Sequence, residues 1–162
     1  IGPKARYLNR AFDYKSGPEN QLTHWTAAGI LEGAPEPTAA PRVPVWDDPS
    51  SGSVEDRART YLDINCAHCH NPGGPGRTTG LDLTYGRRSD KELGILKFPV
   101  AAGRGTGDRS FGVVPGEPEE SIFMFRVESV DSGIMMPELG RRLVHEEGVE
   151  LIRQWIEEMG AT

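Results

Sequence analysis

The chain has 162 residues, a length that fits one domain with an extended arm. Only 36% of its residues are hydrophobic, and its 20 glycines and 13 prolines predict a modest core with many loops. The formal net charge of −6 argues against a nucleic-acid-binding surface, and the sequence contains no run of 18 apolar residues that would span a membrane.

Residues 1–52 are predicted to form an N-terminal arm that packs on the body of the protein. A short helix is expected within residues 20–31, and the Pro- and Ser-rich stretch 35–53 is expected to be irregular. Trp25 and Trp46 favour packing, because a freely mobile linker rarely carries two tryptophans. The chain opens with IGPKARY, without a Met or a signal-peptide pattern, so we expect a mature or excised segment.

Residues 53–162 are predicted to form the main domain. Ser53 and Asp56 have the spacing of a capping box, which predicts a helix from residue 53 to about residue 68. The stretch 72–117 is rich in glycine and shows little periodicity, so it is expected to consist mainly of loops.

Two more helices are predicted in the last third of the chain. Pro118, followed by acidic residues, is typical of a helix start, which predicts a helix over 118–129. A loop is expected over 132–140, and the final helix is expected over 145–159. No strand pattern is evident. The apolar stripe of the final helix consists of Val149, Ile152, Trp155, Ile156 and Met159.

Both cysteines of the chain lie in the stretch INCAHCHNP, residues 64–72. Cys66, Cys69 and His70 form Cys-x-x-Cys-His, the attachment motif of c-type haem. Residues i and i+3 share one face of a helical turn, so both thiols can bond to one edge of a porphyrin. The histidine that follows can then give its Nε2 atom to the iron.

Other interpretations of the two cysteines are weaker. A redox dithiol of the thioredoxin type would need a preceding strand and a βαβ pattern, which the sequence lacks. A zinc site would need a second ligand pair at a regular spacing, and the motif could also be accidental. His68, between the two cysteines, is expected to be a solvated surface side chain. The scattered imidazoles available to a zinc site are His24, His68, His70 and His145.

A six-coordinate haem iron needs a second axial ligand, and the stretch MMPELG at 135–140 offers a methionine thioether. Met136 precedes Pro137, which restricts its backbone, so Met136 is the predicted ligand and Met135 is the alternative. Met124 and Met159 are assigned to core packing, and His24 and His145 are the imidazoles that would make a bis-histidine site instead.

With its elements in this order, the chain resembles a class I c-type cytochrome. The stretches that carry the resemblance are YLDINCAHCHNPGG, LDL (81–83), VPGEPEES (114–121), MMPELGR and EEGVELIRQWI. They are similar to monohaem domains of larger secreted or periplasmic bacterial proteins, some of them carbohydrate-active or quinoprotein-like. The resemblance covers residues 53–160. It implies a mainly α, cytochrome c-like fold with long Gly/Pro-rich loops.

The resemblance also implies one covalently attached haem of the c type (heme c), added outside the cytoplasm. Cys66 and Cys69 would carry the thioethers, and His70 and Met136 would bind the iron. The other ring nitrogen of His70 is expected to donate to a backbone carbonyl of the 71–76 turn. The side chains expected to line the ring are Leu81 and Leu83, and those considered for its propionates are Trp46, Arg77, Tyr85 and Arg104.

A protein of this kind would be an electron carrier and not an enzyme, because an iron with both axial positions filled binds no substrate. Its partner would be a redox protein, for example an oxidative or carbohydrate-active enzyme, in the periplasm or outside the cell. The alternatives are a peroxidase-like haem enzyme and a haem-based sensor with a displaceable methionine. The glycine-rich stretch 97–112 departs from the family pattern, and would cover a propionate edge, meet a partner or form a disordered surface loop.

Overall fold

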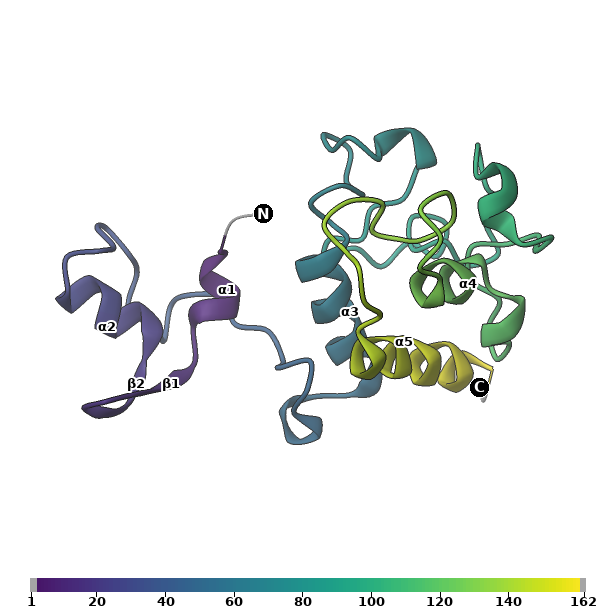
Figure 1. The fold of residues 1–162 in the computed structure, drawn as a ribbon. Helices are drawn as coiled ribbons and strands as arrows, with labels where there is room; N and C mark the ends of the chain where they lie inside the picture. Colours follow the sequence, from purple (N-terminus) through teal and green to yellow (C-terminus); the bar gives the residue numbers. More distant parts are fainter. Residues whose placement is uncertain (1–2, 161–162) are drawn as a thin grey trace. The chain divides into compact units, whose positions relative to one another are not determined.

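The computed structural model describes residues 3–160. The chain divides into two compact units, Ile1–Val45 and Trp46–Thr162, and each is described here by itself (Figure 1). The motif Cys66–His70 and the loop that carries Met136 both belong to the second unit.

The prediction of a mainly α, cytochrome c-like fold is wrong. The structure is 36% helical, with five helices and a small two-stranded sheet, and residues 3–160 show no cytochrome fold. Three of the α-helices have 4, 7 and 7 residues. The abundance of glycine and proline explains the short elements, because glycine raises the entropic cost of a helix and proline removes a backbone donor.

The first unit contains a hairpin that the sequence analysis did not predict. Helix α1 (Ala5–Leu8) precedes strands β1 (Ala11–Tyr14) and β2 (Gly17–Asn20), and α2 (Gln21–Ala27) follows. The strands are antiparallel, with Ala11 opposite Asn20 and Tyr14 opposite Gly17. Three of the four β1 residues are exposed, so the strand has no alternation of buried and exposed positions that would have revealed it.

A buried asparagine organises the rest of the first unit. The Asn9 Nδ2 atom donates to the carbonyl oxygens of Pro37 at 2.8 Å and Ala40 at 3.0 Å, and its Oδ1 accepts from Asn20 Nδ2 at 2.9 Å. These bonds tie the irregular stretch after α2 to the hairpin. The short helix predicted within 20–31 is α2, and Leu22 is its buried residue.

Helix α3 (Val54–Asn65) begins as predicted, after Ser53, whose side chain caps the first turn and bonds to the Asp56 carboxylate. The Asp56 amide donates to Ser53 Oγ at 3.1 Å, and the Ser53 hydroxyl donates to Asp56 Oδ2 at 3.0 Å. The helix ends at Asn65, earlier than the predicted residue 68, and the cysteine motif follows it directly.

The predicted helix 118–129 is divided in two. A 3-10 turn at Pro118–Glu120 precedes α4 (Ile122–Glu128), and Ser121 between them has an extended backbone. The division arises because the Ile122 amide donates to the Phe111 carbonyl and the Phe123 amide to the Gly112 carbonyl, both at 3.0 Å. Three other 3-10 turns are present within residues 3–160, at Pro49–Ser51, Arg77–Thr79 and Gly103–Thr106.

Helix α5 (Glu146–Met159) packs against α3 and α4 and completes the core of the second unit (Figure 1). Trp155 and Ile156 of the predicted stripe are buried, and Met124 is a core residue, as expected. None of the helices described in residues 3–160 is long and apolar enough to cross a bilayer. The buried core consists of Ala58, Leu62, Ala67, Leu83, Leu93, Val113, Met124, Leu151, Ile152, Trp155 and Ile156.

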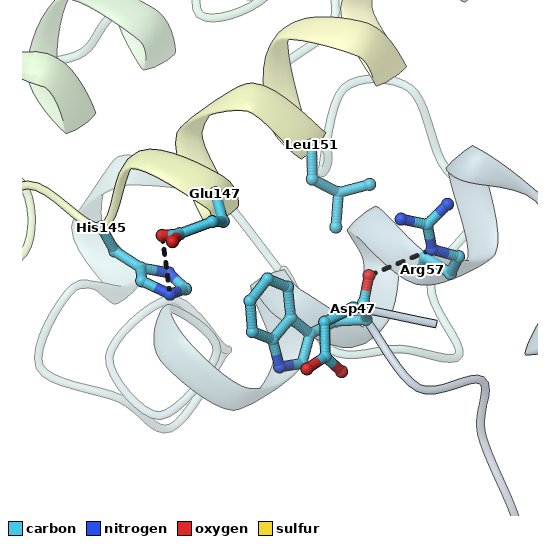
Figure 2. A pocket seen from close by; sticks show the side chains of 6 residues that line it. Asp47, Arg57, His145, Glu147 and Leu151 are labelled. Carbon is cyan, nitrogen blue, oxygen red and sulfur yellow. Dashed lines mark hydrogen bonds and ion pairs between the residues drawn. The ribbon is translucent and has the colours of Figure 1, made fainter. Parts of the chain in front are cut away.

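A surface hollow lies where α3 and α5 meet, within the second unit (Figure 2). The Tyr61 ring stacks on the His145 ring, and the edge of Trp46 meets both. The Tyr61 hydroxyl and His145 Nδ1 are 2.9 Å apart, and burial raises the pKa of Tyr61 to about 12. His145 therefore anchors the start of α5 to α3. The residues that line the hollow are Trp46, Asp47, Arg57, His145, Glu147 and Leu151.

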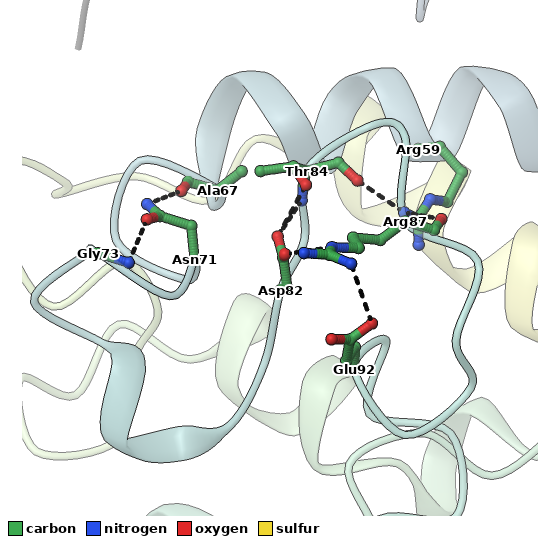
Figure 3. Close-up of polar contacts among 8 residues, drawn as sticks. All are labelled: Arg59, Ala67, Asn71, Gly73, Asp82, Thr84, Arg87 and Glu92. Carbon is green, nitrogen blue, oxygen red and sulfur yellow. Dashed lines mark hydrogen bonds and ion pairs between the residues drawn. The ribbon is translucent and has the colours of Figure 1, made fainter.

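A buried carboxylate, that of Asp82, holds the loop at residues 82–87 in place (Figure 3). Asp82, 4% exposed, accepts at Oδ1 from the Thr84 hydroxyl at 2.7 Å and at Oδ2 from Arg87 Nε at 2.5 Å. Burial alone would raise the pKa of Asp82, but the bonds from Thr84 and Arg87 outweigh it and lower that pKa. Asp82 separates Leu81 from Leu83, so its bonds fix the positions of both leucines.

Replacing Asp82 with Asn should lower the free energy of unfolding at pH 7 by about 1–3 kcal/mol, because it removes a buried hydrogen-bonded charge. The Asp82 pKa is lower in the folded state, so its contribution is present above the unfolded value of about 3.9 and disappears as the pH falls through the folded value. Urea unfolding followed by circular dichroism at pH 7 and at pH 3 should therefore show a deficit that shrinks at the lower pH. Glu92→Gln is the matched control, because Glu92 is 4.0 Å from Arg87 but more exposed, and should change stability by less than about 0.5 kcal/mol. A deficit that is equal at both pH values would contradict this assignment.

Candidate functional site

The two cysteines lie on one turn that continues from the end of α3. The Cys66 amide donates to the Leu62 carbonyl at 2.8 Å, and the Cys66 carbonyl accepts from the amides of Cys69 at 3.1 Å and His70 at 2.9 Å. Both cysteines are free thiols and partly buried. The turn therefore places the two sulfur-bearing residues and the histidine within a single, hydrogen-bonded unit.

The Cys66 thiol is protonated at neutral pH. Burial and, to a smaller extent, the neighbouring Cys69 together raise its pKa to about 12. A reactive redox dithiol requires a lowered thiol pKa, which comes from a helix N-terminus or a nearby cation. Cys66 follows a helix C-terminus, where the dipole disfavours a thiolate.

The His70 ring is held through one of its two nitrogens. Its Nδ1 atom is 3.2 Å from Thr79 Oγ1, and the Thr79 hydroxyl donates its proton to the Gly76 carbonyl at 2.7 Å. Because the hydroxyl proton is directed to the Gly76 carbonyl, Thr79 Oγ1 is left to accept, and this arrangement favours the tautomer with the ring proton on Nδ1. Nε2 then has a free lone pair, and within residues 3–160 it has no hydrogen-bond partner.

The expected partner of this ring, a backbone carbonyl of the 71–76 turn, is replaced by the Thr79 side chain. The Gly76 carbonyl takes part only indirectly, as the acceptor for that hydroxyl. The Leu81 amide also donates to Thr79 Oγ1, at 3.2 Å. Thr79 therefore connects the imidazole both to the turn and to the segment that leads to Leu83.

The turn after His70 packs closely against the motif. Asn71 Nδ2 donates to the Ala67 carbonyl at 2.7 Å, and Asn71 Oδ1 accepts from the Gly73 amide at 2.8 Å (Figure 3). A Cβ atom at Gly74 would lie 2.2 Å from the Cys69 carbonyl oxygen, so this position requires glycine. The turn packs directly on the backbone of the motif.

The His70 imidazole favours its neutral form. Burial lowers its pKa, the positive charge of Arg126 lowers it further, and the negative charge of Glu138 opposes both. Arg126 is in α4, and Glu138 is in the loop that carries Met136. Both charges are thus close enough to His70 to act on it, although they are distant from it in sequence.

Met135 and Met136 are both partly buried, in the loop between α4 and α5. The Met136 amide donates to the Arg126 carbonyl at 2.9 Å, which joins this residue to α4. The Met135 amide donates to the Asp131 carbonyl at 2.8 Å and closes a turn within the loop. Residues 132–140 form no helix or strand, as predicted.

Leu81 and Leu83 differ in their surroundings. Leu83 is 2% exposed, belongs to the core, and its amide donates to the His70 carbonyl at 2.9 Å. Leu81 is partly buried against the core, and its Cδ2 atom would be 3.3 Å from a Cβ at Gly94. The assignment of both side chains to a haem pocket stays a prediction.

The other three histidines differ in their surroundings. The prediction of a solvated His68 is wrong, because the side chain is partly buried and its Nδ1 atom is buried without a hydrogen-bond partner within residues 3–160. His24 pairs with Glu19 at 2.7 Å in the first unit. His145 is bound to Tyr61. No group of three His, Cys, Asp or Glu side chains in the described part of the chain could hold a metal ion, which does not favour a zinc site.

Two of the residues considered for propionates have other contacts. Arg104 Nη2 donates to Asp131 Oδ1 at 2.7 Å, and Trp46 packs on the Tyr61–His145 pair. The sequence analysis missed Thr79, Arg126 and the His145 contact altogether. No known sequence spacing predicts a contact between a histidine and a threonine nine residues later. Only the course of residues 71–80 brings Thr79 to the His70 ring.

Comparison of the chain with protein-family models, with curated proteins and with solved structures found no match. Function is therefore inferred from the motif and from the contacts around it.

Thr79→Val should release the His70 ring, because valine has the same shape but cannot accept from Nδ1–H. In haem-free protein we expect ¹⁵N NMR of the histidine side chains to show His70 with the proton on Nδ1, and a mixture of tautomers in Thr79→Val. Thr79→Ser retains the hydroxyl and should retain the Nδ1–H form. A wild-type ring with its proton on Nε2 would show that Thr79 does not set the tautomer.

Proposed function

We propose that this protein carries one haem bound covalently through Cys66 and Cys69, with His70 as an axial ligand of the iron, and that it transfers single electrons. The observation that carries the proposal is the state of His70. Its Nδ1 atom is engaged by Thr79, so Nε2 is unprotonated and unpartnered, directly after two free thiols on the same turn. This is the donor set that Cys-x-x-Cys-His haem attachment requires.

The thiols fit a thioether role better than the competing roles. A protonated, partly buried Cys66 is poorly suited to thiol–disulfide exchange, and the metal-ligand cluster that zinc requires is not found in residues 3–160. Addition of a thiol across a vinyl group leaves a neutral sulfur, which suits an apolar environment. Leu62 and Ala67, on either side of Cys66, are core residues.

Met136 is our proposed second axial ligand. Its peptide is bonded to α4 through Arg126, and Glu138, two residues later, acts electrostatically on His70. A thioether is a neutral, soft ligand that favours Fe(II), and a haem held by His and Met supplies reversible one-electron transfer between Fe(II) and Fe(III).

The role of the protein in such a transfer is to hold the ligands still and to keep water away. Thr79 fixes the proximal ring, and the α4 contacts restrain the loop that bears the methionine. Rigid ligands keep the reorganisation energy small, since neither bond is broken when the charge changes. We propose further that the partner is a redox protein outside the cytoplasm, where c-type attachment takes place.

Covalent attachment is the first test of the proposal. After expression in a host that matures c-type cytochromes, the wild-type pigment should remain with the polypeptide in acidified acetone. Cys66→Ser should reduce stable incorporation, and Cys66→Ser with Cys69→Ser should release all remaining pigment. Glu55→Gln, on the exposed side of α3, is a control that should behave as wild type. Colourless wild-type protein, or pigment that washes out of it, would refute the proposal.

The ligand assignment has its own test. Met136→Ala should lower the midpoint potential by more than about 60 mV, which corresponds to a tenfold change in the relative stability of the two redox states. It should also abolish the sulfur-to-iron absorption band, whereas Met135→Ala should preserve both. The reverse result would make Met135 the ligand. Rapid binding of carbon monoxide by the reduced wild type would indicate an open sixth position and favour a haem enzyme.

A further inference from the structure

Arg126 contacts the methionine-bearing loop through three different groups. Its backbone carbonyl accepts from the Met136 amide at 2.9 Å, its Nε donates to the Ile134 carbonyl at 2.8 Å, and its Nη2 is 3.6 Å from Glu138 Oε1. Because α4 packs in the core through Met124, these contacts fix residues 134–138 relative to the core.

The Arg126 side chain is also contacted by a second segment of the chain, the 3-10 turn at Gly103–Thr106. It is 17% exposed, whereas its ionic partner Glu138 is 65% exposed. Gly105, the buried residue of the 3-10 turn Gly103–Thr106, lies against it, and a Cβ atom there would be 3.3 Å from Arg126 Nε and Cζ. Gly105, in the glycine-rich stretch 97–112, therefore lies so close to the guanidinium that even a Cβ atom at this position would require a small shift.

The same stretch makes a second contact with the loop, of a different kind. Arg104 donates to Asp131 Oδ1 at 2.7 Å, but its side chain is 66% exposed, so this ion pair is screened by solvent. Asp131 also accepts from the Gly133 amide at 2.8 Å, which holds the beginning of the loop without Arg104. Arg104 and Arg126 thus contact one loop, and only the second of them is enclosed.

We propose that Arg126 is a positioning residue for the proposed ligand Met136: in contact with both Gly105 and residues 134–138, its guanidinium holds the loop from which the Met136 sulfur would bind the iron. The inference rests on the proposed function. It assigns to the glycine-rich stretch the role of holding Arg126 in place. Loss of the side-chain contacts would leave intact the hydrogen bond from the Met136 amide to the Arg126 carbonyl. It would remove the restraints on the loop residues on both sides of Met136.

Arg126→Lys tests this role with the charge unchanged, because lysine cannot reproduce the fixed fork of guanidinium donors. In the haem-loaded, full-length protein, we expect a weaker sulfur-to-iron band and at least tenfold tighter binding of added imidazole, which competes with the methionine. Arg104→Lys is the matched control and should bind imidazole within twofold of wild type. Covalent haem content should be the same in all three proteins.

Gly105→Ala is a second variant, in which the new Cβ atom would require the guanidinium to shift by a few tenths of an ångström without removing it. It should tighten imidazole binding several-fold, and it decides the matter if Arg126→Lys does not fold. The inference would be overturned if folded Arg126→Lys protein bound imidazole with wild-type affinity and kept an intact sulfur-to-iron band. If Arg126→Lys does not fold, wild-type imidazole affinity in Gly105→Ala would overturn it. These results would leave the proposed function standing, whereas absence of covalent haem from the wild type would refute that function instead.

Discussion

The hydrogen bond between His70 and Thr79 is the interaction on which the site depends. A free histidine exchanges its proton between two nitrogens, and only an unprotonated nitrogen can bind a metal. Thr79 settles this choice because its own hydroxyl proton is directed to the Gly76 carbonyl, which leaves its oxygen as an acceptor at 3.2 Å from Nδ1. The tight course of residues 71–80, which requires glycine at position 74, brings that oxygen to the ring.

The two proposed iron ligands are held by different parts of the second unit, which share one core. His70 follows α3, and Met136 is bonded to α4. Both helices contact α5, whose buried residues include Trp155 and Ile156. A disturbance of this core would therefore change the position of one proposed ligand relative to the other. A change in the β1–β2 hairpin of the first unit would not act through these contacts.

Elements with local sequence signals were predicted correctly. The prediction failed for elements whose boundaries depend on hydrogen bonds to distant backbone segments. The capping box at Ser53 and the apolar stripe of α5 are such local signals, and both are confirmed. The division at Ser121 escaped prediction because it depends on hydrogen bonds that the Ile122 and Phe123 amides donate to the carbonyls of residues 111 and 112. The β1–β2 hairpin escaped because the β1 strand is largely exposed. The cytochrome c-like fold, expected from a resemblance in motif order, was wrong, since the order of motifs does not fix the path of the loops between them.

We propose that two sulfur atoms of this chain are bonded to one tetrapyrrole, and the mass of the denatured polypeptide tests this proposal most directly. After maturation in a competent host and complete unfolding, the chain should be heavier than its sequence by one haem. A protease fragment that contains Cys66, Cys69 and His70 should carry all of the added mass. An unmodified mass, or a fragment lighter by two hydrogens because the cysteines have formed a disulfide, would contradict the account.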